Sequence, residues 1–373
     1  MTRPRRARGA CEANPGLRHP GITGRINGRF SGDSTRKVGI AARSRPWLER
    51  RDAMKSRFLL PIIVFCLLPL AALAADFGRI VVFGDSLSDQ GNLASVVGDF
   101  PQPPFYNNRV SNGPVAVEIM ASELGRTLAP SLHLVGPASG TNYAVAAARA
   151  RGPAQIDLGF QVELFLANHG GVAPGADVYV VFIGGNDVRD ARGQLNLADG
   201  EAIVRQAASA VGLQVRRLIG AGARRILIAN APDVGSIPES SLIAALIGDP
   251  GFPARATYLS ELYNNELKGQ MHRIEEETGI DIEGFNIFKR LRKIIKKADK
   301  LGFTNTTDAC FFTASMTFNP ACDFERFVFF DEIHPTARVH AIIGKAMARE
   351  IREELLEEDE HEEEHEHQHE VDD

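Results

Sequence analysis

The sequence predicts an α/β protein with a parallel β-sheet that is covered by helices on both faces. Short apolar segments rich in β-branched residues alternate with longer segments whose apolar residues recur at helical spacing. Strands without polar alternation are typical of a parallel sheet that is buried on both sides. The composition, 44% hydrophobic and 24% charged in 373 residues, suits a globular chain and excludes collagen, coiled coil and wholesale disorder. We expect a five-stranded parallel sheet, with strands at 79–83, 141–145, 177–183, 225–229 and 281–285.

Each predicted element is bounded by residues that end strands or begin turns. The first strand, RIVVF, stops at Gly84, the third stops at Gly184, and the fourth, RILIA, is followed by Pro232. Between the strands, apolar residues three or four positions apart predict amphipathic helices. Functional side chains in such a sheet belong at the carboxyl ends of the strands. The expected helices are 115–124, 155–167, 198–219, 254–278 and 287–300, with a last helix after Pro335.

The charge of the chain is divided among three regions. Residues 1–53 hold 13 Lys and Arg against four acids, whereas 43 acids and 27 bases follow from Ala75 onward. Eleven of those acids lie in 357–373, which contains no base. A folded region with an acidic balance is poorly suited to bind the phosphates of nucleic acid. We therefore expect no nucleic-acid partner.

Residues 54–74 have the layout of a secretory signal peptide. Two basic residues precede an uncharged apolar run that ends in Ala72-Leu73-Ala74, small residues of the kind a signal peptidase reads. A membrane anchor is the alternative, because the run reaches the short end of membrane-spanning lengths. Its prolines and small-residue exit favour cleavage, and hence a secreted or periplasmic protein. The Arg-rich residues 1–53 are then an upstream segment before a misplaced start, and 75–356 form the folded domain.

The cysteines agree with export. Cys11 and Cys66 fall in the segments that would be absent from the exported chain, which leaves Cys310 and Cys322. In an oxidising compartment this pair is expected to form a disulfide that closes a short loop. Two buried free thiols are the alternative.

Three of the predicted turns carry polar residues that together supply hydrolytic chemistry. Ser86 follows the first strand, Asn186 follows the third, and Asp331 and His334 precede the final helix. His334 would take the proton of the Ser86 hydroxyl, and Asp331 would hold the imidazole in the required tautomer. Asn186 would donate its side-chain amide to the oxyanion. Glu332 could substitute in part for Asp331.

These motifs resemble the sequence blocks of the GDSL esterases and lipases, in the SGNH hydrolase superfamily, over nearly all of 77–353. The matching segments read FGDSLSD at 83–89, GGND at 184–187 and DEIHP at 331–335. The resemblance implies a three-layer flavodoxin-like fold with the nucleophile at the serine of the first segment. It also implies that the asparagine of the second segment lines the oxyanion hole.

The resemblance extends to the class of reaction. It implies an exported serine ester hydrolase of carboxylesterase or lipase type, which works through an acyl-enzyme and needs no cofactor or catalytic metal. The segment GFTNTTDAC at 302–310 resembles the bacterial lipase-like branch, for which phospholipase and glycerophospholipid acyltransferase are alternative activities. The expected substrate is a small-molecule or lipid ester, met in transient contact with a membrane or lipid surface.

One position departs from the family pattern. The second block of the family usually supplies a glycine whose backbone N–H joins the serine N–H and the asparagine amide in the oxyanion hole. Here Ala147 stands at that place. An alanine keeps the donor if its φ is negative, so the hole is expected to use Ser86, Asn186 and Ala147. Gly140 is the fallback candidate.

The tail, 357–373, is expected to be disordered because of its composition. Its histidines at positions 361, 365, 367 and 369 alternate with glutamates and could bind divalent metal weakly. A function of a different class follows from this pattern, namely a non-catalytic exported binding protein whose tail buffers metal. Labelling of the nucleophile by a fluorophosphonate would separate that function from ester hydrolysis.

Overall fold

The structure is a computed structural model that describes residues 77–98 and 103–371, with side chains as far as Leu355. The segments 1–53 and 54–74, interpreted above as an upstream segment and a signal peptide, lie outside the described residues. In the described part of the chain, no helix is both long and apolar enough to cross a membrane.

Four parallel strands form the main sheet, in the order β1-β2-β3-β4. They are β1 (Ile80–Gly84), β2 (Val178–Phe182), β3 (Arg225–Ala229) and β4 (Ile282–Phe285). Every residue of β1 and β2 is buried, as expected for a parallel sheet with both faces covered. The last residues of the four strands lie opposite one another in register. The turns that follow the strands are therefore brought to one edge of the sheet.

The prediction of a fifth strand at 141–145 is wrong. This segment runs beside β1, where Tyr143 N–H donates to the carbonyl oxygen of Val82 at 2.7 Å and Val145 N–H to that of Gly84 at 3.1 Å. It forms only isolated parallel bridges, from Asn142 to Val82 and to Pro130. The Asn142 side chain bonds to nearby backbone, accepting from Ala144 N–H at 3.0 Å. Such local side-chain bonds compete with a regular ladder.

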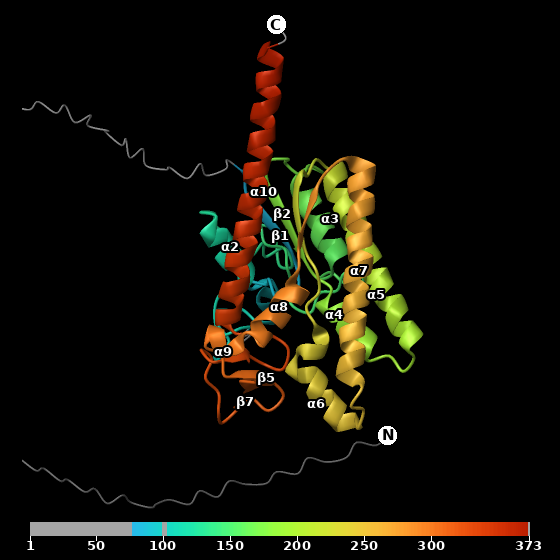
Figure 1. The fold of residues 1–373 in the computed structure, drawn as a ribbon, viewed down its shortest axis with the longest axis vertical. Helices are drawn as coiled ribbons and strands as arrows, with labels where there is room; N and C mark the ends of the chain where they lie inside the picture. The colour runs from blue at the N-terminus through green and yellow to red at the C-terminus, as the bar shows by residue number, and fades with distance from the viewer. Residues whose placement is uncertain (1–76, 99–102, 372–373) are drawn as a thin grey trace, which may run out of the picture. The chain divides into compact units, whose positions relative to one another are not determined.

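Helices cover both faces of the sheet, as the sequence predicts. Figure 1 shows α2 and α10 on one side of the strands and α3, α5 and α7 on the other. Each helix turns an apolar stripe inward, as α5 does with Val204, Val211 and Leu218. Their bounds are α2 (Ala116–Glu123), α3 (Leu158–Asn168), α5 (Leu197–Gly220), α7 (Phe252–Thr278) and α10 (Ala337–Val371).

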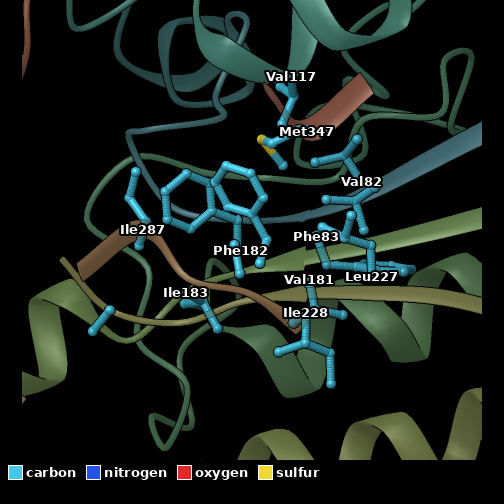
Figure 2. Packing of buried hydrophobic residues seen from close by; sticks show 14 of the residues in the cluster. Val82, Phe83, Val117, Val181, Phe182, Ile183, Leu227, Ile228, Ile287 and Met347 are labelled. Atoms are coloured by element: carbon cyan, nitrogen blue, oxygen red, sulfur yellow. The ribbon is translucent and has the colours of Figure 1, made fainter. Parts of the chain in front are cut away.

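The hydrophobic core lies between the strands and these helices. In Figure 2, Val117 of α2 and Met347 of α10 lie next to each other near Val82 of β1. The side chains of Val181 and Ile228 belong to the neighbouring strands of the same cluster. All of these side chains are almost fully buried, so the core holds the strand ends in fixed positions.

Several shorter elements differ from the sequence prediction. The helix expected at 287–300 is divided at Lys297 into α8 and α9, and α4 and α6 were not predicted. Two small sheets also form, one from β5 and β8 and one from β6 and β7. The bounds are α1 (Asn92–Val97), α4 (Gly185–Arg192), α6 (Pro238–Ile247), α8 (Ile287–Lys296), α9 (Ala298–Leu301), β5 (Asn305–Ala309), β6 (Phe311–Phe312), β7 (Thr317–Phe318) and β8 (Phe327–Phe329).

The backbone of α10 continues to Val371, through a stretch in which the composition predicts disorder. In Figure 1 its last turns extend beyond the rest of the folded region. Glutamate is a good helix former, and the stretch is rich in glutamate. High charge therefore does not exclude helical backbone here.

Candidate active site

The turn after β1 holds Ser86 at the edge where the strands end. The carboxylate of Asp85 accepts the Leu87 N–H at 3.0 Å, and the Asp85 carbonyl accepts the N–H of Ser88 and of Asp89, each at 3.0 Å. A side chain at Gly84 would meet the carbonyl oxygen of Phe182 at 2.5 Å, so β1 and β2 approach closely only because this residue is glycine. These contacts fix the position of the serine.

Ser86, His334 and Asp331 form an unbroken chain of hydrogen bonds. Nε2 of His334 lies 2.8 Å from Oγ of Ser86, a residue 248 positions away in the sequence. Nδ1 of His334 lies 2.8 Å from Oδ2 of Asp331 and 2.9 Å from Oδ1. Because a carboxylate only accepts hydrogen bonds, the neutral ring carries its proton on Nδ1. Nε2 is then an acceptor for the serine hydroxyl.

The loop that carries this acid and base is fixed from several sides. Asp331 Oδ1 accepts the backbone N–H of Ile333 at 2.8 Å and of His334 at 2.6 Å. The carbonyl oxygen of His334 accepts the Phe330 N–H at 2.8 Å. All three members of the hydrogen-bond chain are buried, so the imidazole has little freedom to turn.

Glu332 does not face His334, so the expectation that it could replace Asp331 is wrong. Its carboxylate accepts the N–H and the hydroxyl of Thr313, both at 3.0 Å. Its carbonyl oxygen accepts the Glu239 N–H at 2.8 Å. Thr313 follows β6 and Glu239 belongs to α6. Glu332 therefore joins two surface elements to the loop of the acid and the base.

Asn186 lies in the first turn of α4, where its amide group is held at both ends. Nδ2 donates to the carbonyl oxygen of Ala148 at 2.9 Å, and Oδ1 accepts from Nη1 of Arg189 at 3.0 Å. Arg189 is itself bound to the carboxylate of Glu239 by two hydrogen bonds of 2.8 and 2.7 Å. The second N–H of Nδ2 remains for another acceptor. Asn186 lines the same pocket as Ser86 and His334.

Arg189 was not predicted as part of this site. Its signal in the sequence is its position three residues after Asn186, since side chains at that spacing are neighbours on a helix. Glu239 carries no comparable signal, because it lies 50 positions from Arg189 and reaches it only through the fold.

Ala147 lies close to the site, but its conformation differs from the prediction. Its φ is 69°, which is the left-handed region and not the negative φ that was expected. Val145, two residues earlier, donates its N–H to the carbonyl oxygen of Gly84 at the end of β1, and the following Ala148 accepts from Asn186. Ala147 thus adopts a left-handed conformation, which a glycine at this place would take without strain. Among the described residues, none accepts its backbone N–H.

Gly140 is not at the site, so the fallback assignment is wrong. The next residue, Thr141, accepts the Val82 N–H at 3.0 Å, which places Gly140 beside the middle of β1. A side chain at Gly140 would meet the carbonyl oxygens of Ala129 and Pro130, both at 2.4 Å. Close backbone packing explains this glycine.

Two buried carboxyl groups, those of Asp85 and Asp187, are the neighbours of Ser86 and Asn186 in the sequence. Burial raises the pKa of Asp85 to about 6, against the partial compensation of the hydrogen bond from Leu87. Burial also raises the pKa of Asp187 to about 6, although this side chain accepts the Ala150 N–H at 2.8 Å and pairs with Arg151 at 3.3 Å. Both groups are therefore partly protonated in mildly acidic solution.

An apolar pocket opens beside Ser86. Its wall is formed by Val234 and Ile237 after β3, by Ile287 and Leu291 of α8, and by Ile343 of α10. A wall of this kind suits a hydrocarbon chain better than a sugar or a phosphate. It belongs at the carboxyl end of the sheet, where ligands bind in open α/β folds.

His340 places one polar group in the pocket wall. Its Nδ1 accepts the Ala116 N–H at 3.1 Å, so Nε2 carries the proton. Burial lowers the pKa of His340 to about 3, and the ring is neutral. Nε2 is buried and has no hydrogen-bond partner among the described residues. The sequence motifs gave no signal for this residue.

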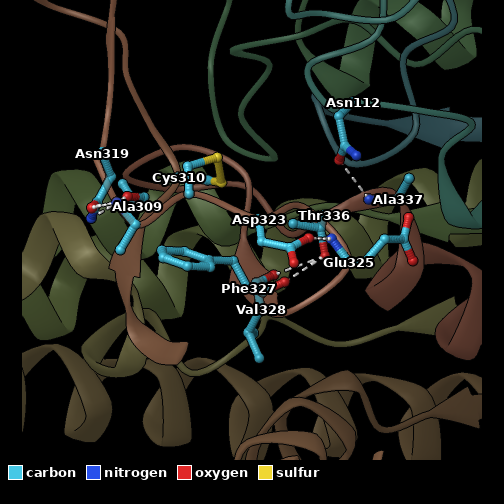
Figure 3. The surroundings of a disulfide bond; sticks show 12 residues. Asn112, Ala309, Cys310, Asn319, Asp323, Glu325, Phe327, Val328, Thr336 and Ala337 are labelled. Atoms are coloured by element: carbon cyan, nitrogen blue, oxygen red, sulfur yellow. Dashed lines mark hydrogen bonds between the residues drawn. A yellow bond between two sulfur atoms is a disulfide. The ribbon is translucent and has the colours of Figure 1, made fainter. Parts of the chain in front are cut away.

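The predicted disulfide between Cys310 and Cys322 is confirmed. It closes the β6–β7 hairpin near β8, and Figure 3 shows it beside Asn319 and Ala309. The side-chain amide of Asn319 donates to the Ala309 carbonyl at 3.2 Å. The alternative of two free thiols is thereby excluded.

The described side chains contain no group of three or more His, Cys, Asp or Glu arranged to hold a metal ion. The histidines at 361, 365, 367 and 369, which could bind metal weakly, lie beyond the described side chains.

Comparison with known proteins agrees with the geometry. Residues 80–347 match the family model described as GDSL-like Lipase/Acylhydrolase. The chain is 31% identical to "Phosphatidylcholine-sterol acyltransferase" of Aeromonas hydrophila, with 66% of this chain and 71% of that protein covered. It is 32% identical to "Lipase 1" of Photorhabdus luminescens over 44% of this chain, which spans 24% of that protein.

A solved structure of Est24, a carbohydrate acetylesterase from Sinorhizobium meliloti, covers 74% of this chain and 98% of its own. Its TM-score is 0.37 and its sequence identity is 14%. The family model matches most of the folded region, and that region includes Ser86, Asn186, Asp331 and His334. The chain therefore belongs to the GDSL-like lipase/acylhydrolase family and is a carboxylic ester hydrolase.

Proposed function

We propose that the protein is an exported serine hydrolase that uses Ser86, His334 and Asp331 as a catalytic triad on acyl esters of lipids. The observation that carries this proposal is the hydrogen-bond chain from Asp331 to the Ser86 hydroxyl, which ends beside an apolar pocket. The hydrogen-bond chain is evidence for a nucleophile whose base is already in place. The apolar pocket is evidence for a hydrocarbon acyl group.

Acylation begins when Oγ of Ser86 attacks the ester carbonyl. Nε2 of His334 takes the hydroxyl proton, and the ionised Asp331 stabilises the imidazolium that forms. The carbonyl oxygen becomes an oxyanion, for which the free N–H of Asn186 and the backbone N–H groups of Ser86 and Ala147 are the proposed donors. When the tetrahedral intermediate collapses, His334 gives its proton to the leaving alcohol, and the acyl group stays on Ser86.

Deacylation repeats these steps with water as the nucleophile. His334 removes a proton from the water as its oxygen attacks the acyl-enzyme, and then returns the proton to Ser86. The products are a carboxylic acid and the free enzyme. The apolar walls around Ser86 limit the number of water molecules that reach the acyl-enzyme.

Acyl transfer is a second candidate activity at the same site. An alcohol that replaces water in deacylation would form a new ester instead of an acid. This candidate is favoured by the 31% identity to a protein whose name is phosphatidylcholine-sterol acyltransferase, across 71% of that protein's length. The ratio of fatty acid to sterol ester formed from phosphatidylcholine and a sterol distinguishes transfer from hydrolysis.

The hydrolase proposal is tested with p-nitrophenyl esters of two to sixteen carbons and with a fluorophosphonate. We expect hydrolysis with a preference for longer chains that fit the pocket, and a covalent adduct on Ser86 that Ser86→Ala abolishes. Failure of both activity and labelling in the folded protein would instead favour the non-catalytic metal-buffering alternative.

Export is part of the proposal and is supported by the disulfide, since such bonds persist in oxidising compartments. We expect the exported chain to begin near Ala75. Intact mass and N-terminal sequencing of the protein from the periplasm or medium test this expectation, and a mature chain that retains 54–74 would contradict it.

A further inference from the structure

The lysines of the folded region are concentrated in one segment, which comprises α8 and α9. Seven lysines follow residue 75, and five of them lie between Lys289 and Lys300. The helix α8 buries Ile287, Leu291 and Ile294 on one side. Lys289, Lys293 and Lys296 emerge on the other side, Lys297 and Lys300 follow in the chain, and all five are exposed. None of the five forms an ion pair among the described residues.

Unlike these lysines, the two arginines of α8 form ion pairs. Arg290 is paired with Glu350, and Arg292 lies 3.5 Å from Asp233. Among the cationic groups of this segment that the structure describes, those without an ion pair are thus the flexible lysine heads. They form a positive face on a folded region whose overall balance is acidic, so an anion that meets this face is attracted there and repelled elsewhere.

Large apolar side chains are exposed on two further elements. Leu246 and Ile247 at the end of α6 are 84% and 56% exposed, and Met316 and Phe318 around β7 are 61% and 51% exposed. Figure 1 shows α6 and β7 at the same end of the protein, below α8. Grouped apolar side chains at a surface are typical of an interaction site.

Both apolar elements and α8 adjoin the active site. Glu332, in the loop of the acid and the base, binds the backbone N–H of Glu239 in α6 and both polar groups of Thr313 beside β6. The buried side of α8 supplies Ile287 and Leu291 to the wall of the acyl pocket. The positive face and the apolar tips therefore belong to elements that contact either the pocket or the loop of Asp331 and His334.

We propose that the lysine face of α8, the end of α6 and the β6–β7 hairpin form a docking surface for an anionic phospholipid bilayer. This inference rests on the proposed lipid ester hydrolysis. The lysines contact anionic headgroups, and the apolar tips enter the boundary between headgroups and acyl chains. Such docking presents the pocket to the ester bonds of the lipid.

A bilayer fits this surface better than other polyanions. A nucleic acid or an acidic protein would satisfy the lysines but would leave Leu246, Ile247 and Phe318 without apolar contact. The acidic end of α10 does not cover the lysines, since Figure 1 shows it extending from the opposite end of the protein. Charge and apolar area together thus indicate lipid.

The test measures co-sedimentation with vesicles of phosphatidylcholine, with and without phosphatidylglycerol, for proteins that carry Ser86→Ala to prevent turnover. The double variant Lys293→Gln/Lys297→Gln should bind the anionic vesicles roughly thirtyfold more weakly, from the attraction of each basic residue to an anionic surface. The matched double variant Lys268→Gln/Lys345→Gln removes the only other two lysines after residue 75 and should bind as the parent does.

A second pair of variants tests the apolar contact. Leu246→Ser/Ile247→Ser should weaken binding to both kinds of vesicle about tenfold or more, from the loss of buried hydrocarbon. With Ser86 restored, the α8 and α6 variants should hydrolyse p-nitrophenyl butyrate at the unaltered rate, since none of the altered residues lines the pocket.

The two hypotheses fail in different ways. Loss of soluble-ester hydrolysis in the unaltered protein would overturn the proposed function, whatever the vesicles show. Equal binding of the lysine double variant and its matched control would overturn the docking surface. Binding to a duplex DNA or to an acidic polypeptide, without binding to anionic vesicles, would also overturn it and would assign the lysines to another polyanion.

Discussion

In the proposed mechanism, the orientation of the Asn186 side-chain amide matters as much as its ability to donate a hydrogen bond. Arg189 fixes its oxygen and Ala148 fixes one of its N–H groups, so the remaining N–H is oriented before substrate arrives. A donor that needs no reorientation stabilises developing charge without a further cost in free energy. In the proposed mechanism, the pair Arg189 and Glu239 therefore positions the Asn186 amide for the oxyanion.

Replacement of Asn186 measures this contribution. Asn186→Ala should lower kcat by roughly 10²–10³ and change KM little, because the donor meets charge that exists only in the transition state. Steady-state kinetics on a p-nitrophenyl ester, with circular dichroism as the folding control, provide the measurement. An unchanged kcat would show that the hole is built from other groups.

Ala147 carries a backbone conformation that costs an alanine about 1–2 kcal/mol. Ala147→Gly should remove this cost and lose part of the gain to the greater freedom of glycine in the unfolded chain. We expect the free energy of unfolding to rise by up to ~1 kcal/mol, with kcat almost unchanged. Denaturant unfolding tests the first part, and a loss of stability would contradict the left-handed assignment.

Some residues of the site could be predicted from neighbouring sequence, and others depend on contacts made by the fold. Ser86, Asp331 and His334 could be predicted, because each sits in a short motif at a strand end or helix start. The left-handed φ of Ala147 and the outward direction of Glu332 could not, because both depend on what packs around them. His340 was missed for the same reason, since its partner Ala116 is 224 positions away.

At the scale of elements, the turn after β1 makes stability depend on pH. The folded-state pKa of Asp85, about 6, lies above its ordinary value of 3.8. Between these values the folded protein binds more protons than the unfolded chain at this residue. The contribution of Asp85 to stability therefore falls as pH rises from 3.8 to 6 and is constant above that window.

Asp85→Asn isolates this contribution, because its side-chain oxygen can still accept the Leu87 N–H. Relative to the unaltered protein, the variant should become more stable as pH is raised from 4 to 7. Guanidinium unfolding at both pH values gives the comparison. The same stability difference at pH 4 and pH 7 would be incompatible with a raised pKa.

The disulfide stabilises the hairpin that belongs to the docking surface. Closing a loop with a sequence separation of 12 contributes about 3 kcal/mol in the chain-entropy account. Cys310→Ala/Cys322→Ala should lower the free energy of unfolding by about that amount and retain most of the hydrolysis of soluble esters, since no sulfur takes part. Complete loss of activity in the folded variant would show that the hairpin is needed for chemistry.

Helices and strands could be predicted where the apolar residues followed a single pattern, either a continuous run or helical spacing. The strands β1 to β4 and the long helices α5 and α7 follow from continuous apolar runs or helical spacing. The segment 141–145 has a strand's composition, yet the side chain of Asn142 bonds both to the nearby Ala144 N–H and to the distant Gln90, which the composition does not reveal. The short α6 and the β6–β7 hairpin were missed, since few of their residues pack against the core.

For the molecule as a whole, α/β architecture followed from the alternation of strands and helices, whereas the number of strands in the sheet did not. The alternation of strand-like and helix-like segments suggests which segments are strands. Whether each one joins the sheet depends on its hydrogen bonds to a neighbouring strand, which the sequence does not show. The clustering of lysines is visible in the sequence, but its relation to α6 and β7 depends on the three-dimensional arrangement.

The acidic C-terminal segment is predicted to be dispensable for chemistry. Deletion of 357–373 should leave kcat/KM for a short soluble ester within about twofold, because charges this far from the site are screened by salt. Assay of the truncated protein at physiological ionic strength checks this. A tenfold fall without added metal would assign the tail a direct role.

Glu332 gives the fold one last property. A single residue, placed between Asp331 and His334, holds α6 by its carbonyl and the neighbourhood of β6 by its carboxylate. A displacement of α6 or of the β6–β7 hairpin would therefore act on the backbone between Asp331 and His334. The surface proposed to rest on lipid is thus connected through Glu332 to the loop that carries Asp331 and His334, so contact with lipid and the position of these two residues are coupled.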